Sequence, residues 1–153
     1  MPNTYTRLHI QAIFAVKFRK ALIDKKWKAK LNMILGNHIN ETGCKTLIVN
    51  GVEDHVHCLF ELKSTVQLSE LMKKVKAKSS KFINDHHLTD DRFEWQRGYS
   101  AFSYAQCQIK EVYDYVAKQE MHHCKTDFQT EHRSMLIENQ IPFDESYYFE
   151  NLI

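Results

Sequence analysis

The feature that most constrains the fold is the hydrophobic period, which changes along the chain. Residues 7–16 alternate apolar and polar side chains, which is the pattern of a strand. The second half of this run is more apolar, so we expect a central strand that is buried on both faces. Residues 20–40 and 68–83 instead place their apolar side chains on one helical stripe. The chain therefore combines strands and helices in one fold.

The remaining short apolar runs predict the other strands. Residues 44–50 and 55–62 have strand composition, and the pair Asn50-Gly51 predicts a hairpin turn between them. Residues 93–104 are extended and rich in aromatic side chains. The order strand, helix, strand, strand, helix, strand predicts an α+β fold of the ferredoxin-like (RRM-like) type, a split βαβ antiparallel sheet. Two helices would cover one face of this sheet and leave the opposite face free for function.

The sequence continues beyond this unit. A third helix is predicted from about Gln106 to His123, with Tyr113 near its buried stripe, and a shorter helical piece around residues 133–139. The aromatic residues 143–149 are expected to pack on the body of the protein or on a second subunit. We expect residues 1–153 to form a single domain with an extra C-terminal helix.

Composition excludes several classes of protein. The 153 residues include only 4 Gly and 2 Pro, so fibrous and disordered chains are excluded. Apolar runs stay far below the roughly 20 residues that span a bilayer, and the first residues do not resemble a signal peptide. The 4 Cys form no Cys-x-x-Cys pair and are typical of free thiols. These features favour a cytoplasmic protein without a membrane partner.

The modest net charge of +2 conceals two halves of opposite sign. Residues 1–83 carry 15 Lys/Arg against 6 Asp/Glu, a net charge of +9, whereas residues 84–153 have a net charge of −7. The basic residues gather in segments 17–30 and 73–81. Such clusters favour a polyanionic partner, although the solvated face of an amphipathic helix would look the same. Charge alone leaves both interpretations open.

Two pairs of residues have spacing suited to catalysis. His55 and His57 lie two apart on a predicted strand, so both imidazoles leave the same face and can bind one metal ion. Tyr115 and Gln119 are four apart on the predicted third helix and therefore share one helical face. A tyrosine hydroxyl near positive charge can act as a nucleophile. The alternatives are a surface strand that happens to carry two histidines, and a tyrosine that only packs at the helix margin.

Taken together, these residues resemble one protein family. The predicted strand contains Asp54-His55-Val56-His57 followed by Cys58-Leu59-Phe60-Glu61. This segment resembles the histidine–hydrophobic–histidine (HUH) strand of the single-tyrosine transposases of bacterial insertion sequences. That group includes the REP-associated tyrosine transposases. Tyr115-Val116-Ala117-Lys118-Gln119 resembles their catalytic Tyr-x-x-x-Gln helix. The stretches 5–17, 71–80 and 95–103 are also similar, so the resemblance covers nearly the whole chain.

The resemblance implies cleavage and rejoining of single-stranded DNA. Carried over by position, His55, His57 and Gln119 would hold Mg²⁺ or Mn²⁺ at the scissile phosphate, and Tyr115 would form a 5′-phosphotyrosine. By donor chemistry alone, two imidazoles and an amide suit Mn²⁺ or another transition metal at least as well as Mg²⁺. The metal therefore stays open between these.

The resemblance also implies partners. Members of the family are typically homodimers in which the tyrosine helix of one subunit completes the histidine site of the other, and they bind DNA hairpins. The residues expected to contact DNA are Arg19, Lys20, Lys73, Lys74, Lys76, Lys78 and Lys81 for the backbone, and Tyr99 and Phe102 for stacking on unpaired bases.

Three alternative functions follow from the same residues. One is a replication or mobilisation nickase, which the short chain disfavours. Another is a catalytically silent module that binds single-stranded nucleic acid on the same fold. The third is a small metal-dependent enzyme that does not act on DNA, which the lysine clusters disfavour.

Overall fold

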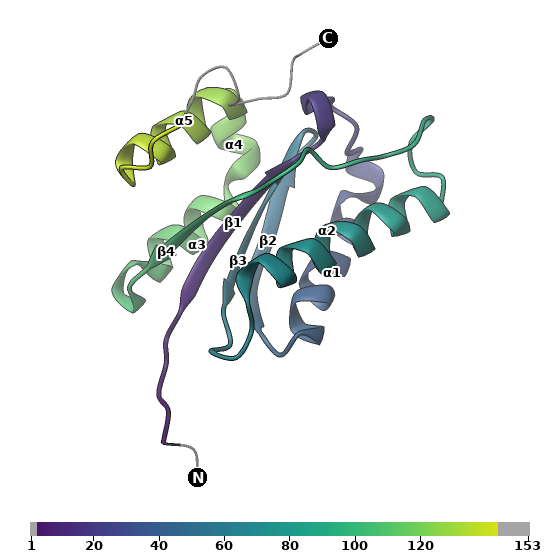
Figure 1. Cartoon of the computed structure of the whole chain (residues 1–153). Helices are drawn as coiled ribbons and strands as arrows, with labels where there is room; N and C mark the ends of the chain where they lie inside the picture. The colour runs from purple at the N-terminus through teal and green to yellow at the C-terminus, as the bar shows by residue number, and fades with distance from the viewer. Residues whose placement is uncertain (1–2, 144–153) are drawn as a thin grey trace.

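The computed structural model describes residues 3–143 and contains a four-stranded antiparallel sheet between two layers of helices (Figure 1). The strands lie in the order β2-β3-β1-β4. The elements are β1 (His9–Ala15), η1 (Lys17–Arg19), α1 (Lys25–Glu41), β2 (Lys45–Val52), β3 (His55–Glu61), α2 (Leu68–Asp85), β4 (Ser100–Tyr104), η2 (Gln106–Gln108), α3 (Ile109–Ala117), α4 (Gln119–His123) and α5 (Phe128–Glu138). The predicted ferredoxin-like α+β fold is confirmed.

The main core lies between the sheet and helices α1 and α2. Phe14 on β1 and Phe60 on β3 point to this side, where they meet Leu35 of α1 and Val75 of α2. β1 pairs with both β3 and β4, so it is the inner strand that the sequence predicts, and it is buried along almost its whole length. Apolar burial on this side is the main force that holds the four strands together.

The opposite face of the sheet is covered, which corrects the prediction that it stays free. In Figure 1, α3, α4 and α5 lie on the side of the sheet away from α1 and α2. Phe128 and Leu136 of α5 pack against Ile13 of β1 and Phe102 of β4 in a second, smaller core. The C-terminal helices therefore form a third layer, and side chains on this face of β3 are enclosed.

The hairpin between β2 and β3 is confirmed, but its turn lies further along the chain than predicted. Asn50 and Gly51 belong to β2 and pair with His57 and Val56 of β3, and the turn follows at residues 53–54. Asn50 stays in the strand because its side-chain amide donates to the backbone carbonyls of Val116 (2.9 Å) and residue 117 (3.2 Å). This long-range contact outweighs the local preference of Asn50-Gly51 for a turn.

The same contact explains why the predicted third helix is not continuous. Lys118 has φ −102° and ψ 24°, and it separates α3 from α4. The Asn50 amide satisfies carbonyls at the end of α3, where a helix leaves its last C=O groups without intrahelical partners. Tyr113 of α3 is 42% exposed, so the prediction that it lies near the buried stripe of this helix is wrong. It faces solvent because α3 covers the sheet with its other side.

The helix predicted at residues 133–139 starts earlier, at Phe128. Asp127 caps it, because its carboxylate accepts a hydrogen bond from the backbone N–H of Thr130 at 2.8 Å. Of the predicted aromatic tail, residues 144–149 lie outside the described part of the chain. Within residues 3–143, no helix is both long enough and apolar enough to cross a membrane.

Replacement of Gly51 by alanine is expected to destabilise the fold. A Cβ atom added there would clash with the carbonyl oxygen of His55 and approach Val56 Cα to 2.8 Å. Backbone atoms inside a hairpin cannot move aside, so Gly51→Ala is expected to lower the free energy of unfolding by about 1–3 kcal/mol. Urea denaturation followed by circular dichroism measures this change.

Gly36→Ala is the matched control, because Gly36 lies in α1 and its added Cβ would meet Thr46 Cγ2 at an ordinary 3.4 Å. Helix propensity favours this change by up to about 1 kcal/mol. Equal destabilisation by both substitutions would contradict the prediction for Gly51.

Candidate active site

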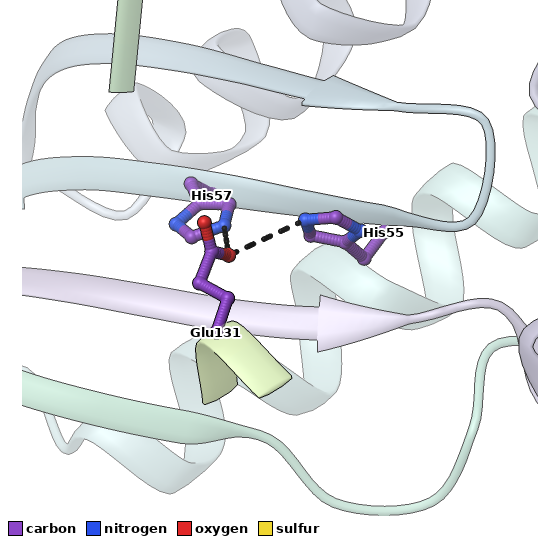
Figure 2. A group of neighbouring side chains, drawn as sticks. All are labelled: His55, His57 and Glu131. Atoms are coloured by element: carbon purple, nitrogen blue, oxygen red, sulfur yellow. Dashed lines mark hydrogen bonds and ion pairs between the residues drawn. The ribbon is translucent and has the colours of Figure 1, made fainter. Parts of the chain in front are cut away.

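His55 and His57 lie side by side on the covered face of β3 (Figure 2). Both side chains are fully buried, and Val56 between them points into the main core on the other face. This is the arrangement that a spacing of two residues on a strand requires. The rigid hairpin holds the two rings with their centroids 5.2 Å apart.

Each imidazole makes its shortest hydrogen bond through Nδ1. His57 Nδ1 is 2.6 Å from the side-chain oxygen of Gln11, whose amide nitrogen donates to the Tyr104 hydroxyl at 2.8 Å. His55 Nδ1 is 2.7 Å from the carboxylate of Asp54. Because both partners are acceptors, both Nδ1 atoms act as donors. A neutral imidazole that donates through Nδ1 has a free lone pair on Nε2, the form in which histidine binds a metal.

Glu131 of α5 points at these two lone pairs (Figure 2). Its Oε1 atom is 3.1 Å from His57 Nε2 and 3.7 Å from His55 Nε2. Burial raises the pKa of Glu131, but the neighbouring imidazoles of His123 and His57 and the hydroxyl of Tyr115 outweigh burial and hold the pKa well below its usual range. Burial in turn lowers the pKa of His57 to about 4, so this imidazole is neutral.

The ligand atoms of His55, His57 and Glu131 all lie within 4.8 Å of one another. Lone pairs in such contact repel unless a proton or a metal ion lies between them. Two imidazoles and a carboxylate are ordinary ligands of a divalent metal. The residues present therefore fit a bound divalent ion.

Glu131 is the functional residue that the sequence analysis missed. It lies in α5 three residues after Phe128 and five before Leu136, and all three are buried. A carboxylate on the buried side of an amphipathic helix is unusual because a buried charge needs a partner. That position was the available signal, but nothing local could indicate that α5 folds back onto β3.

Gln119, the first residue of α4, is fully buried beside the histidines. Its side-chain oxygen lies 3.4 Å from His55 Nε2. Its amide nitrogen is buried and has no hydrogen-bond partner among residues 3–143. The amide oxygen therefore adds a further ligand atom at the edge of the cluster formed by His55, His57 and Glu131.

Tyr115 of α3 reaches the same carboxylate from the other side. Its hydroxyl donates a hydrogen bond to Oε2 of Glu131, and its ring is stacked on His122 with centroids 4.4 Å apart. Burial, together with the hydrogen bond and negative charge of Glu131, raises the pKa of Tyr115 above its ordinary value. Tyr115, His55, His57 and Gln119 thus converge within one chain, although a helix break separates Tyr115 from Gln119.

A cavity of about 440 Å³ opens beside Tyr115. It gives the phenol an approach from solvent, whereas the histidines behind it are enclosed. A molecule that enters the cavity therefore reaches Tyr115 from this side. The lining includes Gln11, Tyr104, Tyr115, His122, Lys125 and Glu131.

The lysines predicted to contact DNA lie away from this cavity, on α2 across the sheet. Lys76 is part of the fold, because its ammonium group donates to the carbonyls of residues 96 (2.7 Å) and 98 (2.6 Å). Lys78 and Lys81 form ion pairs with Glu41 and Asp85, respectively. Two other lysines of the helix, Lys73 and Lys74, are exposed.

The remaining predicted DNA contacts differ in exposure. Phe102 is only 3% exposed because it packs against α5 in the second core, so its predicted stacking on bases is wrong. Tyr99 is 38% exposed and is accessible for stacking. Lys20, just after η1, is exposed, and Arg19 is partly buried.

Comparison with known proteins identifies the family. A family model described as "Transposase IS200 like" matches residues 4–119, about three quarters of the chain. The chain belongs to the IS200-like transposase family. The match includes both histidines, Tyr115 and Gln119, and it ends before Glu131. No curated protein matches the sequence significantly.

Solved structures agree with the fold of this IS200-like transposase. A protein from Deinococcus radiodurans R1 assigned as a transposase superposes with a TM-score of 0.63 at 17% identity, covering 78% of this chain and 95% of its own. A REP-associated tyrosine transposase bound to a REP hairpin gives a TM-score of 0.58 at 13% identity, covering 80% and 73%.

Proposed function

We propose that this transposase cleaves and rejoins single-stranded DNA at the ends of an insertion sequence through a 5′-phosphotyrosine at Tyr115. One observation carries the proposal. The hydroxyl of Tyr115 and the Nε2 atoms of His55 and His57 surround the same carboxylate, that of Glu131, at the inner end of an open cavity. A nucleophile and a metal site that share one residue are arranged for reaction at a single phosphate.

The chemistry balances without an external energy source. The Tyr115 oxygen attacks the phosphorus, and its proton leaves along the hydrogen bond to Glu131. The bond from phosphorus to the 3′ oxygen breaks, and that oxygen takes up a proton to become a 3′-hydroxyl. A divalent ion on His55, His57 and Gln119 would withdraw charge from a non-bridging phosphate oxygen. A 3′-hydroxyl reverses the step and joins DNA, because the phosphotyrosine preserves the phosphodiester energy.

The proposed substrate is single-stranded DNA with a hairpin near the cleavage site. Support comes from family membership and from the similarity to a transposase bound to a REP hairpin. We assign the phosphate contacts to Lys20, Lys73 and Lys74, which are exposed, and base stacking to Tyr99.

Two arrangements of the active site are compatible with this chemistry. The family resemblance implies a homodimer in which the tyrosine helix completes the partner's site. In this chain, however, Tyr115 contacts Glu131 of its own chain, and its ring centroid is 6.1 Å from that of His57. These contacts favour a site that is complete within one protomer.

Metal removal tests the proposed chemistry. The purified protein is incubated with oligonucleotides of each strand of the DNA that borders its gene, labelled at the 3′ end. With Mn²⁺ or Mg²⁺ we expect a labelled protein band on a denaturing gel, because a 5′-phosphotyrosine keeps the 3′ part of the DNA on the protein. EDTA should reduce the band at least roughly 100-fold. A 5′ label should instead leave on a free fragment.

The contrary outcome is equally clear. Retarded migration of the oligonucleotide on a native gel, with no covalent band in either metal, would refute the proposal. It would favour the catalytically silent single-strand-binding module instead.

A further inference from the structure

We propose that His123 and Glu131 complete the metal centre of this transposase, so that three imidazoles and one carboxylate bind a transition-metal ion in preference to Mg²⁺. Both residues lie C-terminal to the segment that matches the family model. The inference rests on the proposed function, because it specifies the metal and the ligands of the same site.

His123 lies against the cluster formed by His55, His57 and Glu131. This last residue of α4 has a side chain only 12% exposed, and its ring centroid is 4.4 Å from that of His55. Its Nε2 atom is buried without a hydrogen-bond partner among the described residues. It lies 3.5 Å from Oε1 of Glu131. A buried imidazole nitrogen normally has a partner, and a metal ion held between His123 Nε2 and Glu131 Oε1 would supply one.

Three histidine nitrogens lie around one carboxylate oxygen at separations typical of metal ligands. Three Nε2 atoms surround Oε1 of Glu131, at 3.1 Å for His57, 3.5 Å for His123 and 3.7 Å for His55. Ligands about 2.0–2.1 Å from a metal at the centre of a tetrahedron are about 3.4 Å from one another. The three separations measured from Oε1 bracket this value. The ligand atoms of His55, His57 and Glu131 all lie within 4.8 Å of one another, and His123 joins this group through its 3.5 Å contact with Glu131.

The donor set decides the class of metal. Mg²⁺ prefers octahedral oxygen ligands and keeps several waters, whereas three imidazoles with one carboxylate suit Mn²⁺, Fe²⁺, Co²⁺ or Zn²⁺. Gln119 offers a fifth atom, since its side-chain oxygen is 3.4 Å from His55 Nε2. Because Oε2 of Glu131 accepts the hydrogen bond from Tyr115, the same carboxylate would connect the ion to the nucleophile.

Metal binding to the full chain tests this inference without DNA. Isothermal titration calorimetry with Mn²⁺, Co²⁺ and Mg²⁺ gives affinities, and the visible absorption of Co²⁺ reports its coordination. We expect one equivalent of Co²⁺ or Mn²⁺ to bind at least roughly 100-fold more tightly than Mg²⁺. His123→Ala and Glu131→Gln should each weaken Co²⁺ binding at least roughly tenfold and change the intensity of the Co²⁺ bands.

Two neighbouring substitutions serve as matched controls. His122→Ala removes the adjacent imidazole, which stacks on Tyr115, and Glu138→Gln neutralises an exposed carboxylate of α5. Both should keep the wild-type affinity for Co²⁺. His123→Asn, which keeps a polar side chain, replaces His123→Ala if circular dichroism shows that the alanine variant is unfolded.

Unchanged Co²⁺ affinity and spectrum in both His123→Ala and Glu131→Gln would overturn the inference. So would tighter binding of Mg²⁺ than of Co²⁺. Either result would leave the proposed function intact if the covalent DNA adduct still forms. Conversely, a normal Co²⁺ centre without any adduct would refute the proposed function alone.

Discussion

Replacement of Tyr115 by phenylalanine is expected to abolish the covalent protein–DNA adduct, with a decrease of roughly 10³-fold or more in cleavage rate. The substitution removes the attacking oxygen and nothing else from the cavity. The hydroxyl contributes one hydrogen bond to Glu131, so the free energy of unfolding should change by only about 1 kcal/mol. The adduct assay with a 3′-labelled oligonucleotide measures the effect.

Tyr113→Phe is the matched control for this experiment. It lies two residues earlier on α3 but is 42% exposed and makes no contact with the histidine cluster in the described structure. Tyr113→Phe should therefore form the adduct at wild-type yield. A full-yield adduct in Tyr115→Phe would move the nucleophile elsewhere. Tyr104 would be tested next, since it lines the same cavity.

The second large effect is expected in a mixture of two inactive variants. Tyr115→Phe lacks the nucleophile, and His57→Asn lacks a metal-binding Nε2 but keeps a donor for Gln11. If each site is complete within one chain, as the contact between Tyr115 and Glu131 favours, the mixture should form no adduct. The measurement is the adduct yield of the equimolar mixture after co-refolding, compared with each variant alone.

A site shared between subunits predicts a different yield. In randomly mixed dimers, half the dimers contain one copy of each variant, and each of these would have one intact site. The mixture would then recover about a quarter of the wild-type adduct. That recovery would contradict a site within one protomer and would support the domain-exchanged homodimer that the family resemblance implies.

Local sequence was sufficient for the elements that depend on hydrophobic period. The alternation before Val16 predicts β1 as a central strand, and the stripes of α1 and α2 predict two helices on one face, as the structure has them. The two-residue spacing of His55 and His57 places both on the same face of β3, because strand geometry allows no other result. The Tyr-x-x-x-Gln motif formed by Tyr115 and Gln119 could also be identified from the sequence.

Predictions from local sequence were wrong where a distant side chain forms a hydrogen bond with a backbone group. The preference of Asn50-Gly51 for a turn gives way because the Asn50 amide binds the end of α3. The same contact lies beside the break at Lys118, inside a segment whose period predicts a single helix. Tertiary packing also reverses the expected exposure of two aromatic residues. Phe102 is buried because α5 covers β4, and Tyr113 is exposed because it lies on the side of α3 that faces solvent.

The sequence alone was enough for the order of elements and for which residues share a face, because both follow from steric periods of two and 3.6 residues. It could not place Glu131 or His123 beside β3, because that requires α4 and α5 to fold back over the sheet. The contacts of His123 with His55 and of Glu131 with His57 join residues 68 and 74 positions apart, so they depend on packing of the third layer. The surroundings of Tyr115, and with them the chemistry proposed for it, were therefore decided by tertiary structure.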